Sequence, residues 1–213
     1  MNAGLDPSWT AALAFTDHFL ISPSPLPGAL ADHIAEHFAR LELIELGLGL
    51  GLFHGFSKML MALGFEPDEM DTTILDTPQR VGTNDATPNL ADPHVLLLAE
   101  RPDLASRWST MAGRLAELDS VPAPIVNAAR SRLAELYRVD WAVIAPPTEV
   151  DTELLDLAVE IAELFAIDVR AISPEHLSRL KALTNDDGVV QLIMSLAIYD
   201  GIYRFAATIP AAA

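Results

Sequence analysis

The chain has 213 residues, 51% of them apolar, and it carries 30 acidic against 13 basic residues for a net charge of −17. This length and apolar content predict a folded globular protein, whereas the acidity argues against nucleic acid and anionic membranes as partners, because both attract clustered Lys and Arg. The absence of cysteine excludes disulfides, thiolate metal sites and thiol catalysis. No basic region precedes an apolar one at the N-terminus, so we expect a cytoplasmic protein.

The first third of the chain predicts three helices. Asp6-Pro7-Ser8 is typical of a helix start, with an N-cap followed by proline, and the proline-rich run 22–28 ends that helix. A second helix begins at about Ala29, with one apolar stripe formed by Leu30, Ile34, Phe38 and Leu41. A long helix then runs over about 41–63 and ends at Gly64, a residue type that favours helix C-termini.

The rest of the chain also predicts helices. Residues 65–92 are rich in Asp, Thr, Pro and Asn without an apolar period, which predicts a linker or a long surface loop. Helices are predicted after it at 93–99, 105–118, 124–137, 141–145, 152–166, from the Ser173-Pro174 cap, and from Asn185 to about Thr208. No segment shows a sustained period of two with β-branched residues, so we expect an all-α fold.

Two stretches of the chain resemble each other at a constant offset of 146 residues. The run 46–58, which contains Phe53-His54-Gly55, returns as 192–204, which contains Tyr199-Asp200-Gly201. A constant offset of this kind indicates a duplication and predicts two pseudo-symmetric halves. We expect an N-terminal repeat over 1–64, the linker over 65–92 and a C-terminal part over 93–213 that contains the second repeat, 151–210.

The run 43–65 is long and apolar enough to suggest a membrane span. It contains Glu45, His54 and Lys58, however, and its duplicate contains Asp200 and Arg204. Charges at such positions are costly in lipid. We therefore expect a buried helix in a soluble core and no membrane partner.

Three segments of the chain occur in a characteristic order. The run 98–104 contains Arg101-Pro102 and precedes Trp108, the run 128–137 ends in Tyr137 and precedes Trp141, and a long helix closes the chain. In order and spacing they resemble the carboxymuconolactone decarboxylase and AhpD-like alkylhydroperoxidase superfamily. The resemblance covers most of 93–210, and its C-terminal half is repeated at 7–67. It implies an AhpD-like helical fold and a homo-oligomer, with a dimer expected.

The catalytic residues of the family's thiol peroxidases are missing from this chain. Those enzymes carry a Glu, two Cys and a His, and the corresponding positions here, anchored on Arg132, are Asn127, Val139, Ala142 and Pro146. The N-terminal long helix keeps Glu45, and the position of the first Cys is Ser57 there and Tyr203 in the C-terminal helix. The resemblance therefore implies the fold but not peroxidase activity, and we expect no cofactor.

His54 and Lys58 lie four residues apart and so share one helical face. A pseudo-dyad between the halves would make them face Asp200 and Arg204. Lys58 and Arg204 would then bind a small anion, and His54 would act as an acid or base oriented by Asp200. The other interpretation is that Asp200 and Arg204 form an ordinary ion pair and that His54 is a polar residue within a core contact.

Two further motifs have simple structural explanations. His33, Glu36 and His37 match an H-x-x-E-H zinc motif, but we expect Glu36 to turn away from His37, and His37 to be partly buried in the core, so no metal is expected. The glycines at 47, 49 and 51 lack the strand and the third glycine of a nucleotide-binding loop. They predict a close helix contact instead.

Two functions stay open at this point. The chain is either a non-catalytic ligand-binding or oligomeric scaffold protein, which we favour, or a cofactor-free acid/base enzyme such as a decarboxylase, isomerase or lactone-type lyase. The enzyme would act on a small anionic molecule, with His54 and Asp200 as its catalytic residues. The expected ligand-binding residues are Lys58, Arg204, Ser57, Tyr203 and Glu45.

Overall fold

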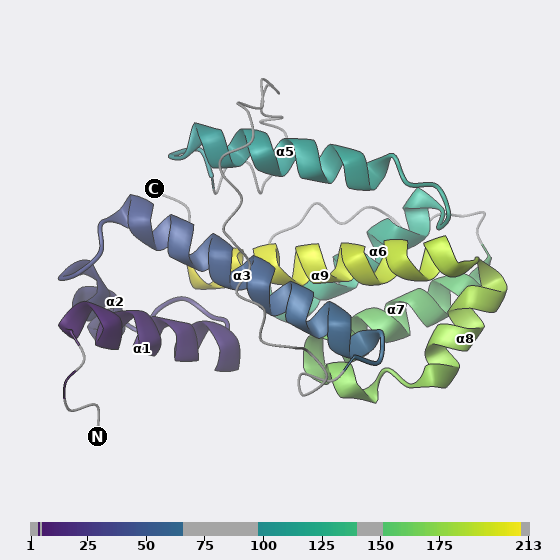
Figure 1. The fold of residues 1–213 in the computed structure, drawn as a ribbon, viewed down its shortest axis with the longest axis horizontal. Helices are drawn as coiled ribbons and strands as arrows, with labels where there is room; N and C mark the ends of the chain where they lie inside the picture. The colour runs from purple at the N-terminus through teal and green to yellow at the C-terminus, as the bar shows by residue number, and fades with distance from the viewer. Residues whose placement is uncertain (1–3, 5, 66–97, 140–150, 210–213) are drawn as a thin grey trace.

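The computed structural model describes residue 4 and residues 6–65, 98–139 and 151–209 (Figure 1). Within these ranges the chain forms helices and no strand, which confirms the predicted all-α class. The predicted linker and the short helices at 93–99 and 141–145 lie almost entirely outside these ranges. The helices are α1 (Pro7–Ile21), α2 (Gly28–Ala35), α3 (Arg40–Ala62), α5 (Pro102–Ala116), α6 (Ala123–Tyr137), α7 (Thr152–Ile167), α8 (Pro174–Leu183), α9 (Asp186–Thr208) and the short 3-10 helix η2 (Val169–Ala171).

Helix α9 forms the centre of the core. In Figure 1 it runs through the middle of the molecule, with α3 crossing in front of it and α5 along the upper edge. Nearly every residue from Leu192 to Phe205 is buried, as expected of a helix that is apolar all round. Phe15 and Ile44, from the N-terminal helices, belong to the same continuous core as Leu192. The two predicted halves therefore share one core.

Two helices, α3 and α9, are long and apolar enough to cross a membrane by length and composition. Over their most apolar stretches, 78% of α9 but only 33% of α3 is buried inside the protein. Burial therefore accounts for the apolar character of α9, while α3 presents apolar side chains on the surface. The expected cytoplasmic location and the absence of a membrane partner stay predictions.

The predicted helix starts are confirmed by hydrogen-bonded caps. The Asp6 carboxylate accepts the Ser8 N–H at 2.9 Å at the start of α1, and the Asn185 side chain accepts the Gly188 N–H at 2.8 Å at the start of α9. These bonds satisfy N–H groups that have no partner within their own helix. Gly64 follows the end of α3 with a φ of 88°, a conformation that costs glycine nothing and other residues appreciable strain.

The second and third helices are separated differently from the prediction. The expected stripe through Phe38 requires a longer second helix, but α2 ends at Ala35. The Glu42 carboxylate accepts the N–H of Ala39 at 2.8 Å, which satisfies an N–H that precedes the first turn of α3. This bond stabilises the start of α3 at Arg40, and Phe38 packs against the core from the connection between the helices.

The bounds of the helices keep the sequence offset of 146 residues. Helix α3 spans 40–62, and α9 spans 186–208, which is the same interval after subtraction of 146. Subtraction of 146 from the bounds of α7 gives 6–21, close to the 7–21 of α1. The same subtraction for α8 gives 28–37, close to the 28–35 of α2. The residues that repeat in the sequence therefore form helices of matching length and order.

Helices α3 and α9 pack against each other, antiparallel, through their small residues. A Cβ atom added to Gly51 would lie 2.6 Å from the carbonyl oxygen of Gly201, and one added to Gly55 would overlap the carbonyl oxygen of Ala197. The predicted close helix contact at the glycines is therefore confirmed. Residues 146 positions apart are Gly51 and Ala197, and Gly55 and Gly201. Applied to the contact between Gly51 and Gly201, this offset gives the contact between Ala197 and Gly55, which also occurs.

Candidate functional site

The predicted cluster around His54, Lys58, Asp200 and Arg204 forms, and its centre is the fully buried carboxylate of Asp200. One carboxylate oxygen accepts from Lys58 Nζ at 2.8 Å and from the Tyr137 hydroxyl at 2.5 Å. The other oxygen accepts from Arg204 Nε at 3.2 Å. We call these five residues the Asp200 cluster. Its members come from α3, α6 and α9.

The positive charges of the Asp200 cluster outnumber its one carboxylate, since Lys58 and Arg204 are both buried beside it. The backbone of α1 offsets part of this excess. Arg204 donates from its terminal nitrogen to the carbonyl of Leu20 at 3.0 Å and to that of Phe19 at 3.4 Å. These carbonyls belong to the last turn of α1, where unpaired oxygens form the negative end of the helix dipole.

Burial is the main influence on the pKa values of Lys58 and Tyr137. Burial lowers the pKa of the Lys58 ammonium, and the negative charge of Asp200 acts in the opposite direction. The Lys58 nitrogen also lies 4.7 Å from the ring centre of Phe165, a distance at which a cation is attracted to the ring face. Burial, followed by the charge of Asp200, raises the pKa of Tyr137 far above its usual value, so its hydroxyl stays a donor.

His54 belongs to the Asp200 cluster but makes no hydrogen bond to its carboxylate. Its Nε2 atom lies 3.8 Å from the nearer oxygen of Asp200, which is beyond hydrogen-bond distance. Among the described atoms this buried nitrogen has no hydrogen-bond partner. Burial, followed by the positive charge of Arg204, lowers the pKa of His54 to about 4, although Asp200 opposes the shift. The imidazole is therefore uncharged at neutral pH.

The depressed pKa of His54 makes the protein less stable in mild acid. The unfolded chain binds a proton at His54 near pH 6.5, whereas the folded chain binds it only near pH 4. Stability is therefore fully present above pH 6.5 and is lost as the pH falls towards 4, by about 1 to 2 kcal/mol once the partial exposure of the ring is allowed for. Urea unfolding at pH 7 and pH 5 measures this loss.

The His54→Gln variant is the control for this prediction, because glutamine stays neutral at both pH values. Its free energy of unfolding should fall less between pH 7 and pH 5 than that of the wild type. Equal falls in the two proteins would contradict the assigned pKa.

The other predicted site residues lie apart from the Asp200 cluster. Glu45 is exposed and forms an ion pair with Arg101, next to the start of α5. Ser57 is exposed, and its hydroxyl donates to the carbonyl of Phe53 one turn earlier. Tyr203 is fully buried, with its ring centre 5.8 Å from that of Tyr199. The two histidines of the metal motif, His33 and His37, lie at the end of α2, near the protein surface.

Tyr137 and Phe165 contact the cluster, but the sequence analysis did not include them among the candidate site residues. Tyr137 is the last residue of α6, 63 positions from Asp200, and Phe165 is a core residue of α7. The spacing of residues along one helix cannot place either beside the cluster. The resemblance of the run ending at Tyr137 to a family motif was the one available signal.

A cavity of about 830 Å³ lies between α5 and α9, away from the Asp200 cluster. Its apolar lining includes Met111, Leu115 and Met194, and Arg114 and Asp187 lie among its polar lining residues. It shares no lining residue with the cluster. The acid/base residues and this space for a ligand therefore do not form one site.

The Asp200 cluster is built chiefly to satisfy charge inside the core. Asp200 accepts three hydrogen bonds, so its carboxylate has little capacity left to act as a base. Within the cluster, the buried Nε2 of His54 has no hydrogen-bond partner among the described atoms. No family model, curated protein or solved structure matches this chain.

Proposed function

We propose that this chain is a divergent, cysteine-free protein of the AhpD-like type that serves as a non-catalytic oligomeric scaffold. The oligomer is a dimer in which α3 of one copy packs against α3 of a second copy. The observation that carries the proposal is an apolar stripe on α3 that remains exposed, although the equivalent stripe on α9 is covered. The engagement of Asp200, Lys58 and Arg204 with one another favours a structural over a catalytic role for the cluster.

The outward stripe of α3 consists of Leu41, Phe53 and Phe56, with Gly49 beneath them. At 100° per residue these positions fall within an arc of about 120°, on the side of the helix away from α9. The exposed Glu42 and Glu45 fall within the same arc at the start of α3, so the uncharged part of the stripe is the part around Phe53 and Phe56. Phe53 is 80% exposed, Leu41 44% and Phe56 40%. Burying one such phenylalanine is worth about 1.5 to 3 kcal/mol. The stripe therefore supplies a strong driving force for association.

The positions on α9 that correspond to the two phenylalanines of the stripe are covered within the chain. The offset of 146 converts Phe53 into Tyr199 and Phe56 into Ile202, which are 4% and 0% exposed. The ring of Trp108, on α5, meets Tyr199 edge-on with ring centres 6.0 Å apart, and α6 packs along α9. On α9, therefore, the residues that correspond to the exposed phenylalanines of α3 form a packing surface for other helices.

The connection between α5 and α6 is hydrogen-bonded to α9. Gln191 on α9 accepts the Val121 N–H at 2.9 Å and donates to the Leu118 carbonyl at 3.0 Å. The offset of 146 converts Gln191 into Glu45, whose partner is the side chain of Arg101. Among the described residues, α6 and Trp108 of α5 therefore pack on α9, while the residue that precedes α5, Arg101, reaches α3 near its N-terminal end through Glu45.

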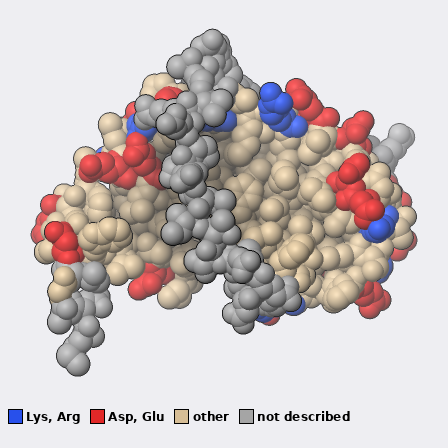
Figure 2. Space-filling view, in the orientation of Figure 1, with Lys and Arg blue, Asp and Glu red and all other residues tan. Residues whose placement is uncertain are grey.

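A second copy of the chain is the occupant that fits the outward stripe. Figure 2 shows acidic side chains near the start of α3, whereas the rest of the face that α3 crosses, between its grey residues, is largely free of charged side chains. Identical copies of an acidic chain repel each other, so contact through the uncharged part of this face, around Phe53 and Phe56, minimises that repulsion. An isologous contact of two α3 stripes also closes the assembly at two copies.

The proposal predicts a dimer that a charge on the stripe dissociates. The wild-type protein should show twice the chain mass of 23.0 kDa by light scattering coupled to size exclusion, at concentrations of about 10 to 100 μM. Phe53→Asp should be monomeric with unchanged helical content, because it places a charge at the centre of the contact.

Ile167→Asp provides the matched control, since Ile167 is also exposed, at 75%, but ends α7. This variant should remain dimeric. A monomeric wild type at the highest concentration, or a Phe53→Asp protein that stays dimeric, would overturn the proposal.

A second candidate function is acid/base chemistry at His54, favoured by the buried Nε2 atom that lacks a partner. A small carboxylate bound between His54 and Lys58 would stabilise the imidazolium and raise the pKa of His54. An NMR titration of the His54 ring with and without succinate tests this directly. An unchanged pKa at saturating succinate would leave the scaffold function as the one supported.

A further inference from the structure

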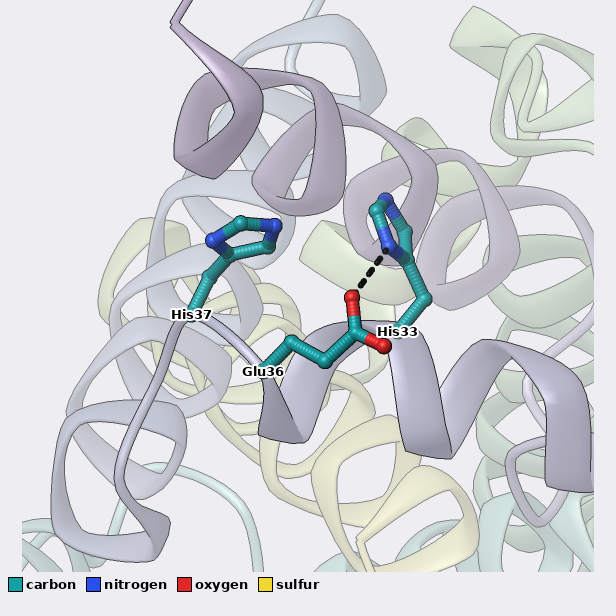
Figure 3. A group of neighbouring side chains, drawn as sticks. All are labelled: His33, Glu36 and His37. Atoms are coloured by element: carbon teal, nitrogen blue, oxygen red, sulfur yellow. Dashed lines mark ion pairs between the residues drawn. The ribbon is translucent and has the colours of Figure 1, made fainter.

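The side chains of His33, Glu36 and His37 converge at the end of α2. Each offers one ligand atom, and these atoms all lie within 4.8 Å of one another. His33 Nδ1 lies 3.7 Å from a carboxylate oxygen of Glu36. The rings of the two histidines meet edge to face with their centres 5.4 Å apart. Figure 3 shows Glu36 reaching back along α2 so that its carboxylate lies beside His33.

This convergence corrects the expectation that Glu36 turns away from His37, because a ligand atom of Glu36 lies within 4.8 Å of one of His37. That expectation assumed a regular α-helix through His37, but α2 ends at Ala35. The N–H of His37 donates to the carbonyl of Ile34, three residues back, at 3.0 Å. A turn of this kind brings residues three apart onto the same side. Glu36 therefore comes to lie beside His33, and His37, which is partly buried as expected, lies close to both.

The surroundings of the three residues favour a cation. They lie at the C-terminal end of α2, where unpaired backbone carbonyls give the helix its negative pole. The carboxylate of Asp6, the N-cap of α1, is also close. Hydrogen bonds from Ser8 are the main reason that the pKa of Asp6 is lowered, and the charge of His37 contributes to the shift.

We propose that His33, Glu36 and His37 bind one divalent first-row transition-metal ion, with Zn²⁺ as the representative. Two imidazole nitrogens and one carboxylate oxygen are the donor set that Zn²⁺ accepts, with a water as the fourth ligand. Tetrahedral coordination at Zn–N distances of about 2.0 to 2.1 Å brings donor atoms to roughly 3.3 Å from one another. His33 and Glu36 are 40% and 70% exposed, so their side chains are free to close this gap by rotation.

Calorimetric titration of the tag-free, EDTA-treated full chain with ZnCl₂ at pH 7 tests the proposal. The wild type should bind one equivalent. His33→Ala, His37→Ala and Glu36→Gln should each weaken binding by about tenfold or more. Binding should also weaken strongly at pH 5, because protons compete with the metal ion for imidazole nitrogens. Addition of Zn²⁺ should shift the imidazole resonances of His33 and His37.

His18→Asn is the matched control, because His18 lies in the neighbouring helix α1 and bonds the Ser24 carbonyl instead. Its affinity for Zn²⁺ should equal that of the wild type. Circular dichroism confirms that each variant keeps its helices. The proposal is overturned if the wild type shows no saturable binding, or if the three ligand variants bind as tightly as the wild type, which would place the ion elsewhere.

Discussion

Asp200→Asn is expected to lower the free energy of unfolding by about 3 to 5 kcal/mol, the usual effect of removing one partner from a buried ion pair. Asparagine keeps the shape of the side chain but removes its negative charge. Lys58 and Arg204 would then remain in the core without a counter-ion. The Tyr137 hydroxyl would also keep only a neutral acceptor in place of a carboxylate.

Chemical unfolding at pH 7 measures this effect, with Glu163→Gln as the control. Glu163 forms a pair with Arg132 at 2.6 Å, but both side chains are more than one-third exposed. Loss of such a surface pair costs about 1 kcal/mol or less. A loss below about 1 kcal/mol for Asp200→Asn as well would show that the buried network contributes no more than a surface pair.

Gly55→Ala is expected to destabilise the protein by about 3 kcal/mol, at the upper end of the range for overpacked cores. The added Cβ would overlap the backbone carbonyl of Ala197. A backbone atom cannot rotate away, so α3 and α9 would have to separate along their contact. This cost exceeds the gain of about 1 kcal/mol that alanine brings to a helix interior.

Gly49→Ala is the control on the same helix, because a Cβ at Gly49 would meet no atom within 4 Å. In the Phe53→Asp background, which removes the proposed dimer contact, it should stabilise the protein by about 0.5 to 1 kcal/mol through helix propensity alone. The two substitutions should therefore change the thermal midpoint in opposite directions. A stabilising effect of both would contradict the close approach of α3 and α9.

Helix positions were accessible from the sequence because caps and apolar periods are local. The cap at Asn185 places the start of α9, and Gly64 places the end of α3. The end of α2 was missed because it depends on Glu42, which starts the next helix and lies beyond the apolar stripe. Local patterns could not show that Phe38 lies in the connection between α2 and α3 and not within a helix.

The centre of the candidate site could also be predicted, because the offset between the copies pairs His54 with Asp200 and Lys58 with Arg204. The rest required the three-dimensional structure. The bond from Tyr137 to Asp200 joins residues 63 positions apart, and that from Arg204 to Leu20 joins residues 184 positions apart. Contacts between residues so far apart in the chain cannot be predicted from the periodicity or spacing of residues.

The Asp200 cluster also has a consequence for the alignment of α3 and α9. Glycines recur every fourth residue along α3, at 47, 51 and 55, so sliding α3 by one turn would again oppose glycine to α9. Such a slipped arrangement would move Lys58 away from Asp200 by about 5.4 Å and leave the Lys58 charge buried without its partner, while Asp200 would keep Arg204 and Tyr137. We infer that the ion pair selects one register from several that the glycines would allow. The Asp200→Asn protein should then populate more than one packing, seen as additional or broadened amide resonances.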